Sequence, residues 1–378
     1  MIDYEILRVI WWLLLGVLLI GFAVMDGFDM GVAMLLPFSG RTDMERRIII
    51  NTVAPVWEGN QVWLILGVGA IFAAWPLVYA TVFSSMNIAL FLAILGLIVR
   101  PVSFKFRSKM THPYWRSSFD VALCISSFVP ALIFGITIGN TLQGVPFHFD
   151  ESLRVFYTGT FWELLNPYNM ICGIISVAMM LMHGGVYLML KSNDTHILRR
   201  TTHIVYWAII VMLLLLTLNG YLTLNVVKGF HIIDAVHNGA SNPLLKKVIT
   251  TVGAWGANYT SYPLLWSMPF ATYVFALLTT ICIRIHKLGV AFITSGLCLA
   301  SIIATVGISI FPFILPSTTH PNSSLTVWDA SSSKATLNIM LIATLIFVPI
   351  VIAYTSWVYR VLRGKVTATS VDENQSSY

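Results

Sequence analysis

The chain has 378 residues, of which 57% are hydrophobic and only 10% are charged, and its formal net charge is +6. A soluble domain carries roughly a quarter charged residues, so this composition excludes an ordinary soluble enzyme and indicates an integral membrane protein. Basic loops beside anionic lipid account for the positive charge, and no nucleic-acid partner is expected.

Nine apolar segments are long enough to cross a bilayer, whose core needs about 20 residues of helix. The second is the least regular, because it begins with the polar run WEGNQ and contains Pro76. We expect a single transmembrane domain over 1–366 and a polar, disordered C-terminal tail over 367–378. The expected spans are about 7–36, 58–77, 79–102, 118–140, 167–190, 201–225, 262–283, 289–313 and 335–360.

The distribution of Lys and Arg predicts the orientation of these spans. If all nine cross and the C-terminus is cytoplasmic, sixteen of the 22 basic residues lie in inside loops and six lie outside. Cytoplasmic loops of membrane proteins are enriched in Lys and Arg. We therefore expect the N-terminus outside, and we expect the longer loops, at about 141–166, 226–261 and 314–334, to lie outside as well.

Two carboxylates, Asp26 and Asp29, interrupt the inner half of the first segment. They are three residues apart and so share one face of a helix. A charged side chain at the centre of a bilayer costs roughly 3 kcal/mol or more, and such residues usually face a bundle interior or water and mark ion or proton paths. Gly27 and Gly31 form a G-x-x-x-G pair that lets a neighbouring helix approach. The pattern predicts that both acids are tucked against another helix.

The next three segments bring more polar groups to the same membrane surface. The second begins inside, the third ends inside, and the fourth opens inside with Asp120. The groups concerned are Trp57, Glu58, Asn60, Gln61, Arg100 and Asp120. We predict that the first three spans direct their ionisable side chains into a shared interior near the inner leaflet.

A structural interpretation of the same groups stays open. In this interpretation, Asp26 or Asp29 forms an ion pair with Arg100, and the pair only fixes the geometry of the bundle. Glu58 and Asp120, each near the expected start of a helix, complement the helix dipole without a further role. Elsewhere, His183 lies beside three methionines in an apolar segment, where packing is favoured over haem ligation. The four cysteines lack the paired spacing of a metal or redox site, and we interpret them as core residues.

Several stretches together resemble subunit II of the cytochrome bd quinol oxidases. They are IWWLLLGVLLIGFAVMDGFDMGV (10–32), WEGNQVW (57–63), AAWPLVYA (73–80), RPVSF (100–104), GNTLQGVPF (139–147), SNPL (241–244) and FPFILPS (311–317). The resemblance extends to about residue 365. It implies an all-α polytopic membrane protein with about nine transmembrane helices, arranged as two four-helix bundles plus one peripheral helix.

The resemblance also implies a function. It points to a subunit of a bacterial inner-membrane oxidase that oxidises quinol, reduces dioxygen to water and contributes to the proton motive force, with a periplasmic N-terminus and a cytoplasmic C-terminus. The implied partners are subunit I, which holds the b and d haems, membrane lipid and, in many members, a small single-helix subunit. No haem ligand, metal ligand, catalytic residue or independent activity is expected in this chain. Some members hold a structural quinone in this subunit.

On the family motifs, Asp29, Glu58 and Arg100 fall at positions linked to proton uptake or subunit stability. Two departures remove titratable groups from this region: Lys105 stands where an acid is common, and Val56 where a histidine often precedes the tryptophan. We expect a cytoplasmic-side proton pathway or polar network made of Glu58, Asp29, Asp26, Arg100, Gln61, Asn60 and Trp57.

Two other functions stay open. In the first, the subunit is purely structural and is needed only for assembly. In the second, the chain is a secondary transporter, a class of protein that also places polar groups inside helices. The inverted repeats and unwound helices that are common in transporters are not evident in the sequence.

Overall fold

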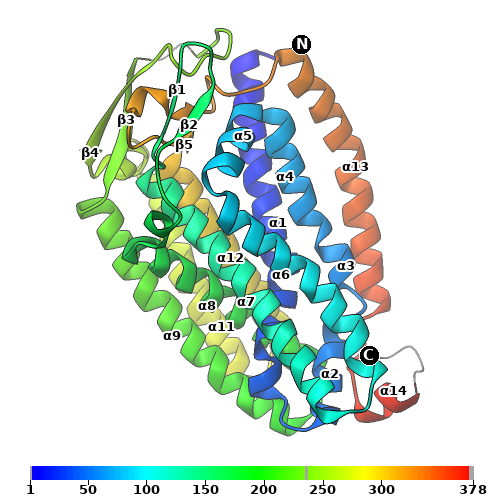
Figure 1. Cartoon of the computed structure of the whole chain (residues 1–378). Coiled ribbons are helices and arrows are strands. Elements are labelled where there is room, and N and C mark those ends of the chain that lie inside the picture. Colours follow the sequence, from blue (N-terminus) through cyan, green and yellow to red (C-terminus); the bar gives the residue numbers. More distant parts are fainter. Residues whose placement is uncertain (1, 235–236, 374–378) are drawn as a thin grey trace.

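The computed structural model describes residues 2–234 and 237–373. Within these residues, eight helices are long and apolar enough to cross a membrane. Two further helices, Asp43–Val53 and Trp57–Ala74, meet at a bend of 43° and pass the same test only together, which gives nine candidate spans when the pair is counted as one. The long helices lie side by side and give an elongated molecule (Figure 1). The expectation of a mostly helical chain with about nine spans is confirmed.

The first bundle is built from the N-terminal part of the chain. Its helix α1 packs against α4 and α7, and α6 packs against α7. Two short helices, α2 and the single turn α3, connect α1 to α4, and α5 connects α4 to α6. The bounds are α1 Tyr4–Ser39, α2 Asp43–Val53, α3 Trp57–Asn60, α4 Val62–Ala74, α5 Pro76–Ser85, α6 Asn87–Phe106 and α7 Pro113–Gln143.

Two of the expected spans have different limits. The second was expected to run through Pro76, but α4 ends at Ala74 and Pro76 begins α5. Proline has no N–H to donate and fits the first turn of a helix better than its interior. The third expected span consists of α5 and α6, which are separated at Met86.

The second bundle packs against the first through α8. Within it, α8 packs against α9 and α12, and α11 packs against α12 and α9; α8 also contacts α1 and α7. The peripheral helix α13 lies along α1 and α4, and Leu337 is its one buried residue. Two four-helix bundles plus one peripheral helix are thus confirmed. The bounds are α8 Pro167–Lys191, α9 Thr195–Asn225, α11 Ser267–Arg284, α12 Leu288–Ile310 and α13 Lys334–Val361.

Three antiparallel hairpins occupy the end of the molecule that holds the N-terminus (Figure 1), which we call the hairpin end. They lie in the three long loops, with registers that include Phe147↔Tyr157, Phe230↔Thr250 and Phe313↔Thr326. Short helices accompany them. The bounds are β1 Phe147–Phe149, β2 Val155–Tyr157, β3 Lys228–Asp234, β4 Lys247–Val252, β5 Phe313–Leu315, β6 Leu325–Thr326, η2 Trp162–Leu165, η3 Ala254–Gly256, α10 Ala257–Ser261, η4 Pro263–Trp266 and η5 Pro321–Ser323.

The opposite end, which we call the α2 end, also holds the C-terminal segment. The expectation of disorder there is wrong for part of the tail, because Ala368–Glu373 form helix α14 and this helix packs against α2. Val371 is only 2% exposed. The N–H of Val366 donates to the Lys191 carbonyl at 2.8 Å, which fixes the preceding segment to the end of α8. One apolar side chain and this backbone pairing order a segment whose composition is otherwise polar. Residues 374–378 of the expected tail lie outside the described residues.

The two bundles approach closely where Gly31 of α1 meets Gly184 of α8. A Cβ atom at Gly31 would lie 2.0 Å from the carbonyl oxygen of Met180, and one at Gly184 would lie 2.6 Å from Cα of Gly31. At Gly27 the nearest atom would be 3.7 Å away. The G-x-x-x-G pattern therefore predicts the close contact correctly for Gly31 and not for Gly27.

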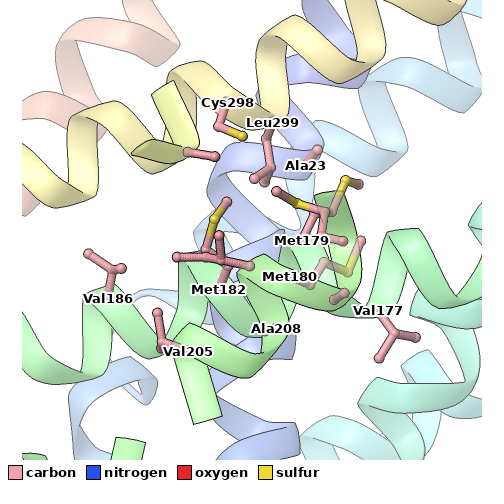
Figure 2. Close-up of a cluster of buried hydrophobic side chains, with 14 of the residues drawn as sticks. Ala23, Val177, Met179, Met180, Met182, Val186, Val205, Ala208, Cys298 and Leu299 are labelled. Atoms are coloured by element: carbon pink, nitrogen blue, oxygen red, sulfur yellow. The ribbon is translucent and has the colours of Figure 1, made fainter. Parts of the chain in front are cut away.

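A cluster of apolar side chains packs beside this crossing. Figure 2 shows the methionines of α8 (Met179, Met180 and Met182) packed among buried side chains that include Cys298 and Leu299 of α12. Cys172 and Cys282 are also buried, Cys124 is half-buried, and all four cysteines are unpaired. The interpretation of the methionines and cysteines as packing residues agrees with these positions.

Candidate functional site

Asp26 and Arg100 form a bidentate ion pair inside the first bundle. Arg100 Nη2 lies 2.7 Å from Asp26 Oδ1, and Nη1 lies 3.2 Å from Oδ2. Neither side chain is exposed. A buried pair loses the hydration of both ions, and only good geometry offsets this loss. The two parallel hydrogen bonds supply such geometry and join α1 to α6.

Asp29 starts a hydrogen-bonded chain that ends on the peripheral helix. The side-chain amide of Asn60 donates to Asp29 Oδ2 at 2.7 Å, and the hydroxyl of Tyr359 donates to Asn60 Oδ1 at 2.7 Å. Asp29 and Asn60 are buried. The chain therefore links α1, α3 and α13 next to the ion pair.

Tyr359 was not predicted from the sequence. It lies near the end of an apolar segment, where tyrosines commonly occupy the interface between membrane and water. Nothing in its spacing from the earlier segments distinguishes it from such a residue. Only the packing of α13 against α1 and α4 brings it to Asn60.

Three buried polar atoms of this cluster have no hydrogen-bond partner in the described part of the chain. They are Asp29 Oδ1, Arg100 Nε and Trp57 Nε1. The Trp57 ring stacks on Phe104 with centroids 5.5 Å apart, and Arg100 Cζ lies 6.0 Å from the Trp57 ring. Buried polar groups in folded proteins nearly always have a partner, and ordered water supplies it where protein does not. Each of these three atoms can therefore still bond to an ordered water or to a bound group.

Glu58 lies outside this interior. Its side chain is 62% exposed and lies 2.9 Å from Lys105 Nζ. Positions three apart share a helical face, and in α3 the inward pair is Trp57 and Asn60, which are both buried. Gln61 is half-buried. Of the seven predicted residues, the structure brings five together, namely Asp26, Asp29, Trp57, Asn60 and Arg100, and places Glu58 on the surface.

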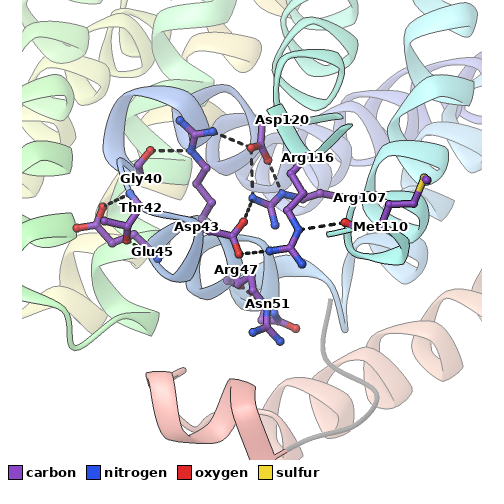
Figure 3. Close-up of polar contacts among 11 residues, drawn as sticks. Gly40, Thr42, Asp43, Glu45, Arg47, Asn51, Arg107, Met110, Arg116 and Asp120 are labelled. Atoms are coloured by element: carbon purple, nitrogen blue, oxygen red, sulfur yellow. Dashed lines mark hydrogen bonds and ion pairs between the residues drawn. The ribbon is translucent and has the colours of Figure 1, made fainter. Parts of the chain in front are cut away.

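A second ionic cluster lies at the α2 end and includes Asp120 (Figure 3). Asp120 accepts hydrogen bonds from Arg107 and, at 2.9 Å, from Arg46. Arg107 and Arg116 both reach Asp43 of α2. The interpretation of Asp120 as a dipole-complementing residue is wrong: α7 begins at Pro113, so Asp120 lies well inside the helix. Its carboxylate instead anchors α2 and the turn η1, Arg107–Lys109.

The capping of α2 adds a link from this end to the second bundle. Thr42 and Glu45 form a capping box at the start of α2, and Arg200 of α9 lies 2.6 Å from Glu45. The capping glutamate thus also forms an ion pair with α9. Such reciprocal capping fixes where a helix begins.

His183 is a packing residue in this structure. Its Nδ1 lies 2.7 Å from the Ser295 hydroxyl and its Nε2 lies 3.0 Å from the Val24 carbonyl oxygen. Because the carbonyl can only accept, Nε2 carries the proton in this contact. The ring also stacks on Phe292. Both ring nitrogens are used to join α8 to α1 and α12.

Comparisons with known proteins agree with the fold and with the sequence motifs. A family model described as "Cytochrome bd terminal oxidase subunit II" matches residues 7–362. The chain is 48% identical over 379 residues to "Cytochrome bd-I ubiquinol oxidase subunit 2" of Escherichia coli (strain K12), covering 100% of both chains. It is 29% identical over 363 residues to "Cytochrome bd ubiquinol oxidase subunit 2" of Bacillus subtilis (strain 168), covering 95% of this chain and 96% of that one.

A solved structure shares the fold. The match is to the bd oxidase from Geobacillus thermodenitrificans, with a TM-score of 0.65 at 16% sequence identity. It covers 94% of this chain and 98% of that chain. At this identity the likeness concerns the arrangement of the helices.

Proposed function

The chain belongs to the cytochrome bd terminal oxidase subunit II family, and from this premise we propose that it supports the haem-bearing subunit I and forms part of a cytoplasmic-side proton pathway. Family membership confirms the resemblance that the sequence motifs indicated. The chain is therefore a multi-pass membrane subunit of a quinol oxidase, an oxidoreductase complex of the bacterial respiratory membrane. A secondary transporter is not supported, since the full-length matches are to oxidase subunits.

The observation that carries the proposal is the chain of contacts from Asp29 through Asn60 to Tyr359, next to the Asp26–Arg100 pair. Reduction of dioxygen to water consumes protons, and an energy-conserving oxidase collects them from the cytoplasm. Titratable side chains inside a membrane protein commonly mark such paths. Arg100 balances the charge of Asp26, so we assign the relay role to Asp29, whose Oδ1 has no partner among the described residues.

Glu58 supplies the entrance in this proposal. It lies at the exposed surface, two residues before Asn60 in the same helical turn. Lys105 forms an ion pair with it at 2.9 Å, although both side chains remain more than half exposed. Exposed ion pairs contribute about 0–1 kcal/mol, so this contact does not hold Glu58 away from water.

We place the α2 end on the cytoplasmic side and the hairpin end in the periplasm. The basic residues support this orientation, because sixteen of the 22 Lys and Arg residues lie on the side assigned to the cytoplasm. The N-terminus is then periplasmic and the C-terminus cytoplasmic.

The haems belong to subunit I in this proposal. Both nitrogens of His183 are hydrogen-bonded to protein atoms, so neither is free to ligate a haem. Quinol and dioxygen would react through the complex. A small single-helix subunit would be a further partner, as it is in many members of the family.

A second candidate role is to hold a structural quinone. Trp57 Nε1 favours it, because it is a buried donor without a protein acceptor among the described residues, and a quinone carbonyl is an acceptor. The measurement is the amount of quinone extracted per haem d from the purified complex. Trp57→Phe should lower that amount if this site holds the quinone, and an unchanged amount would exclude it.

The proton-pathway proposal is tested with Asp29→Asn and Glu58→Gln in the assembled complex. We expect normal haem content and reduced quinol oxidase turnover in both variants, with a loss of about tenfold or more for Asp29→Asn and slower proton uptake in vesicles. Glu163→Gln, which removes an exposed carboxylate from the hairpin end, is the control. If Asp29→Asn instead lowers haem content while turnover per haem stays normal, the cluster is a packing device and the subunit is structural.

A further inference from the structure

A pocket at the α2 end of the second bundle is not used by the proposed proton pathway. Its volume is about 420 Å³. It lies between the last turn of α8, the turn that joins α11 to α12, and the segment that follows α13. The lining residues are Leu190, His286, Lys287, Leu288, Gly289, Val290 and Lys365.

The charge of this pocket is of one sign. Lys287, Lys365 and His286 are exposed side chains that can carry positive charge, and no Asp or Glu is among the lining residues. Lys365 Nζ donates to the Asn193 side-chain oxygen at 2.8 Å, a contact that leaves its charge unbalanced. No acidic partner of these three side chains is found within the described ranges. Arg284, also exposed, ends α11 just before the turn.

The position of the pocket relates it to a membrane surface. α11 and α12 both belong to candidate membrane spans, and only residues 285–287 separate them. The pocket therefore opens where two spans leave the hydrocarbon. Its apolar members, Leu190, Leu288 and Val290, belong to the candidate spans α8 and α12. His286, Lys287 and Lys365 lie outside the spans, in the connecting segments. A Cβ atom at Gly289 would meet no atom within 4 Å, so there is space beside the backbone at the start of α12.

We propose that this pocket binds a phosphate group, supplied by the headgroup of an anionic phospholipid. Basic pockets between transmembrane helices on the cytoplasmic side are suited to acidic lipid headgroups. The lysines would contact the phosphate, and Leu190, Leu288 and Val290 would meet the start of the acyl chains. Because Lys287 belongs to the α11–α12 turn and Lys365 to the C-terminal segment, one bound phosphate would link the two.

The experiment compares lipid binding by the intact, purified complex before and after removal of two charges. The variants are Lys287→Gln/Lys365→Gln and, as the control, Lys228→Gln/Lys247→Gln, which removes two exposed lysines from the hairpin end. After delipidation, binding of phosphatidylglycerol is measured by native mass spectrometry. Each lysine near an anionic surface contributes about a fivefold effect, so the pocket variant should bind at the tightest site about 25-fold more weakly. The control should bind normally.

A second arm separates the two sources of phosphate. Inorganic phosphate and phosphatidylcholine are tested as competitors of phosphatidylglycerol. If neither displaces it at millimolar concentration, the ligand is an anionic lipid headgroup. Displacement by inorganic phosphate would identify a free-phosphate site and overturn the lipid assignment. Equal binding by the pocket variant and the control variant would overturn the site itself. Haem content of each preparation verifies that the variants are assembled.

Discussion

The side-chain amide of Asn60 lies 2.7 Å from Asp29, and this contact holds the carboxylate of α1 against the short helical turn α3. The same amide accepts a hydrogen bond from Tyr359. Since Asn60 has one donor group and one acceptor oxygen on its side chain, Tyr359 fixes which way the amide faces. The peripheral helix thereby orients a group in the candidate proton pathway.

Tyr359→Phe should therefore weaken the pathway without unfolding the subunit. Loss of one hydrogen bond of this kind is worth about 1 kcal/mol, which corresponds to roughly a fivefold decrease in a rate that depends on it. We expect normal haem content and quinol oxidase turnover reduced by about this factor. Turnover and haem are measured on the same preparation, with Tyr354→Phe on the exposed face of α13 as control. Equal turnover in the two variants would show that Tyr359 has no part in the pathway.

The Asp26–Arg100 pair should be needed for assembly. Removing one partner leaves an uncompensated charge in the bundle, and a broken buried pair costs about 3–5 kcal/mol. Arg100→Met should therefore reduce the yield of haem-containing complex severely, whereas the double variant Asp26→Asn/Arg100→Met should recover part of it. Lys105→Gln breaks the exposed pair with Glu58 and should change the free energy of unfolding by no more than about 1 kcal/mol. The yield of haem-containing complex should then stay close to that of wild type.

Recovery in the double variant is the informative result. It would mean that the charge imbalance, and not the lost contact, caused the defect of Arg100→Met. If the double variant is as poor as the single one, the two side chains contribute to stability through packing or through other partners, and the balance of their charges is not the controlling factor.

The crossing of α1 and α8 gives a prediction for Gly31, and Gly27 on the same helix provides its control. Gly31→Ala would place a Cβ atom 2.0 Å from a backbone oxygen of α8, so the helices would have to move apart. Overpacking of a core costs about 1–3 kcal/mol, and more where backbone must shift. Gly27→Ala, where the nearest atom is 3.7 Å away, should be tolerated. The melting temperature of the complex and its haem content measure the difference, and equal melting temperatures would show that the bundles separate without cost.

Much of the fold follows from patterns that the sequence carries. Apolar length gives the spans, because a bilayer requires about 20 residues of helix whatever the neighbours are. The depth of Asp26, Asp29 and Arg100 follows from counting residues along helices. The limits of the spans are harder to predict. A proline can begin a helix or interrupt one, and the sequence around Pro76 does not distinguish the two; in the structure Pro76 begins α5.

Contacts between distant elements could not be predicted in the same way. The sequence pattern puts Glu58 and Gln61 on one face of a helix, but it does not say which face is inward. Trp57 and Asn60 have the same spacing, and the packing of α3 chooses them. Likewise Asp120 meets arginines of α2 and η1 because helix α2 and the turn η1 lie beside α7 in the fold. Tyr359 meets Asn60 because α13 packs against α1 and α4, and Val371 is buried because α14 packs against α2. No local sequence signal predicts either contact.

The ordered C-terminal segment leads to the last prediction. The Lys191 ammonium donates to the carbonyl of Leu362 and, at 3.1 Å, to that of Gly364, just past the end of α13. Carbonyls at a helix C-terminus lack partners within the helix, and a cation there is favourable. Lys191→Met keeps the length and apolar part of the side chain but removes the donors.

We expect Lys191→Met to loosen the segment that begins after Val361 while the bundles stay intact. The basic sites Arg363 and Lys365 would then be cleaved faster by trypsin, and loss of the two hydrogen bonds predicts an increase of about tenfold or more in the cleavage rate. Lys109→Met, which removes an exposed lysine elsewhere at the α2 end, is the control. Val371→Asp should act in the same direction, because it places a charge where Val371 is buried against α2. If neither variant changes the cleavage rate relative to wild type, the segment is held by other contacts and the Lys191 hydrogen bonds do not stabilise it.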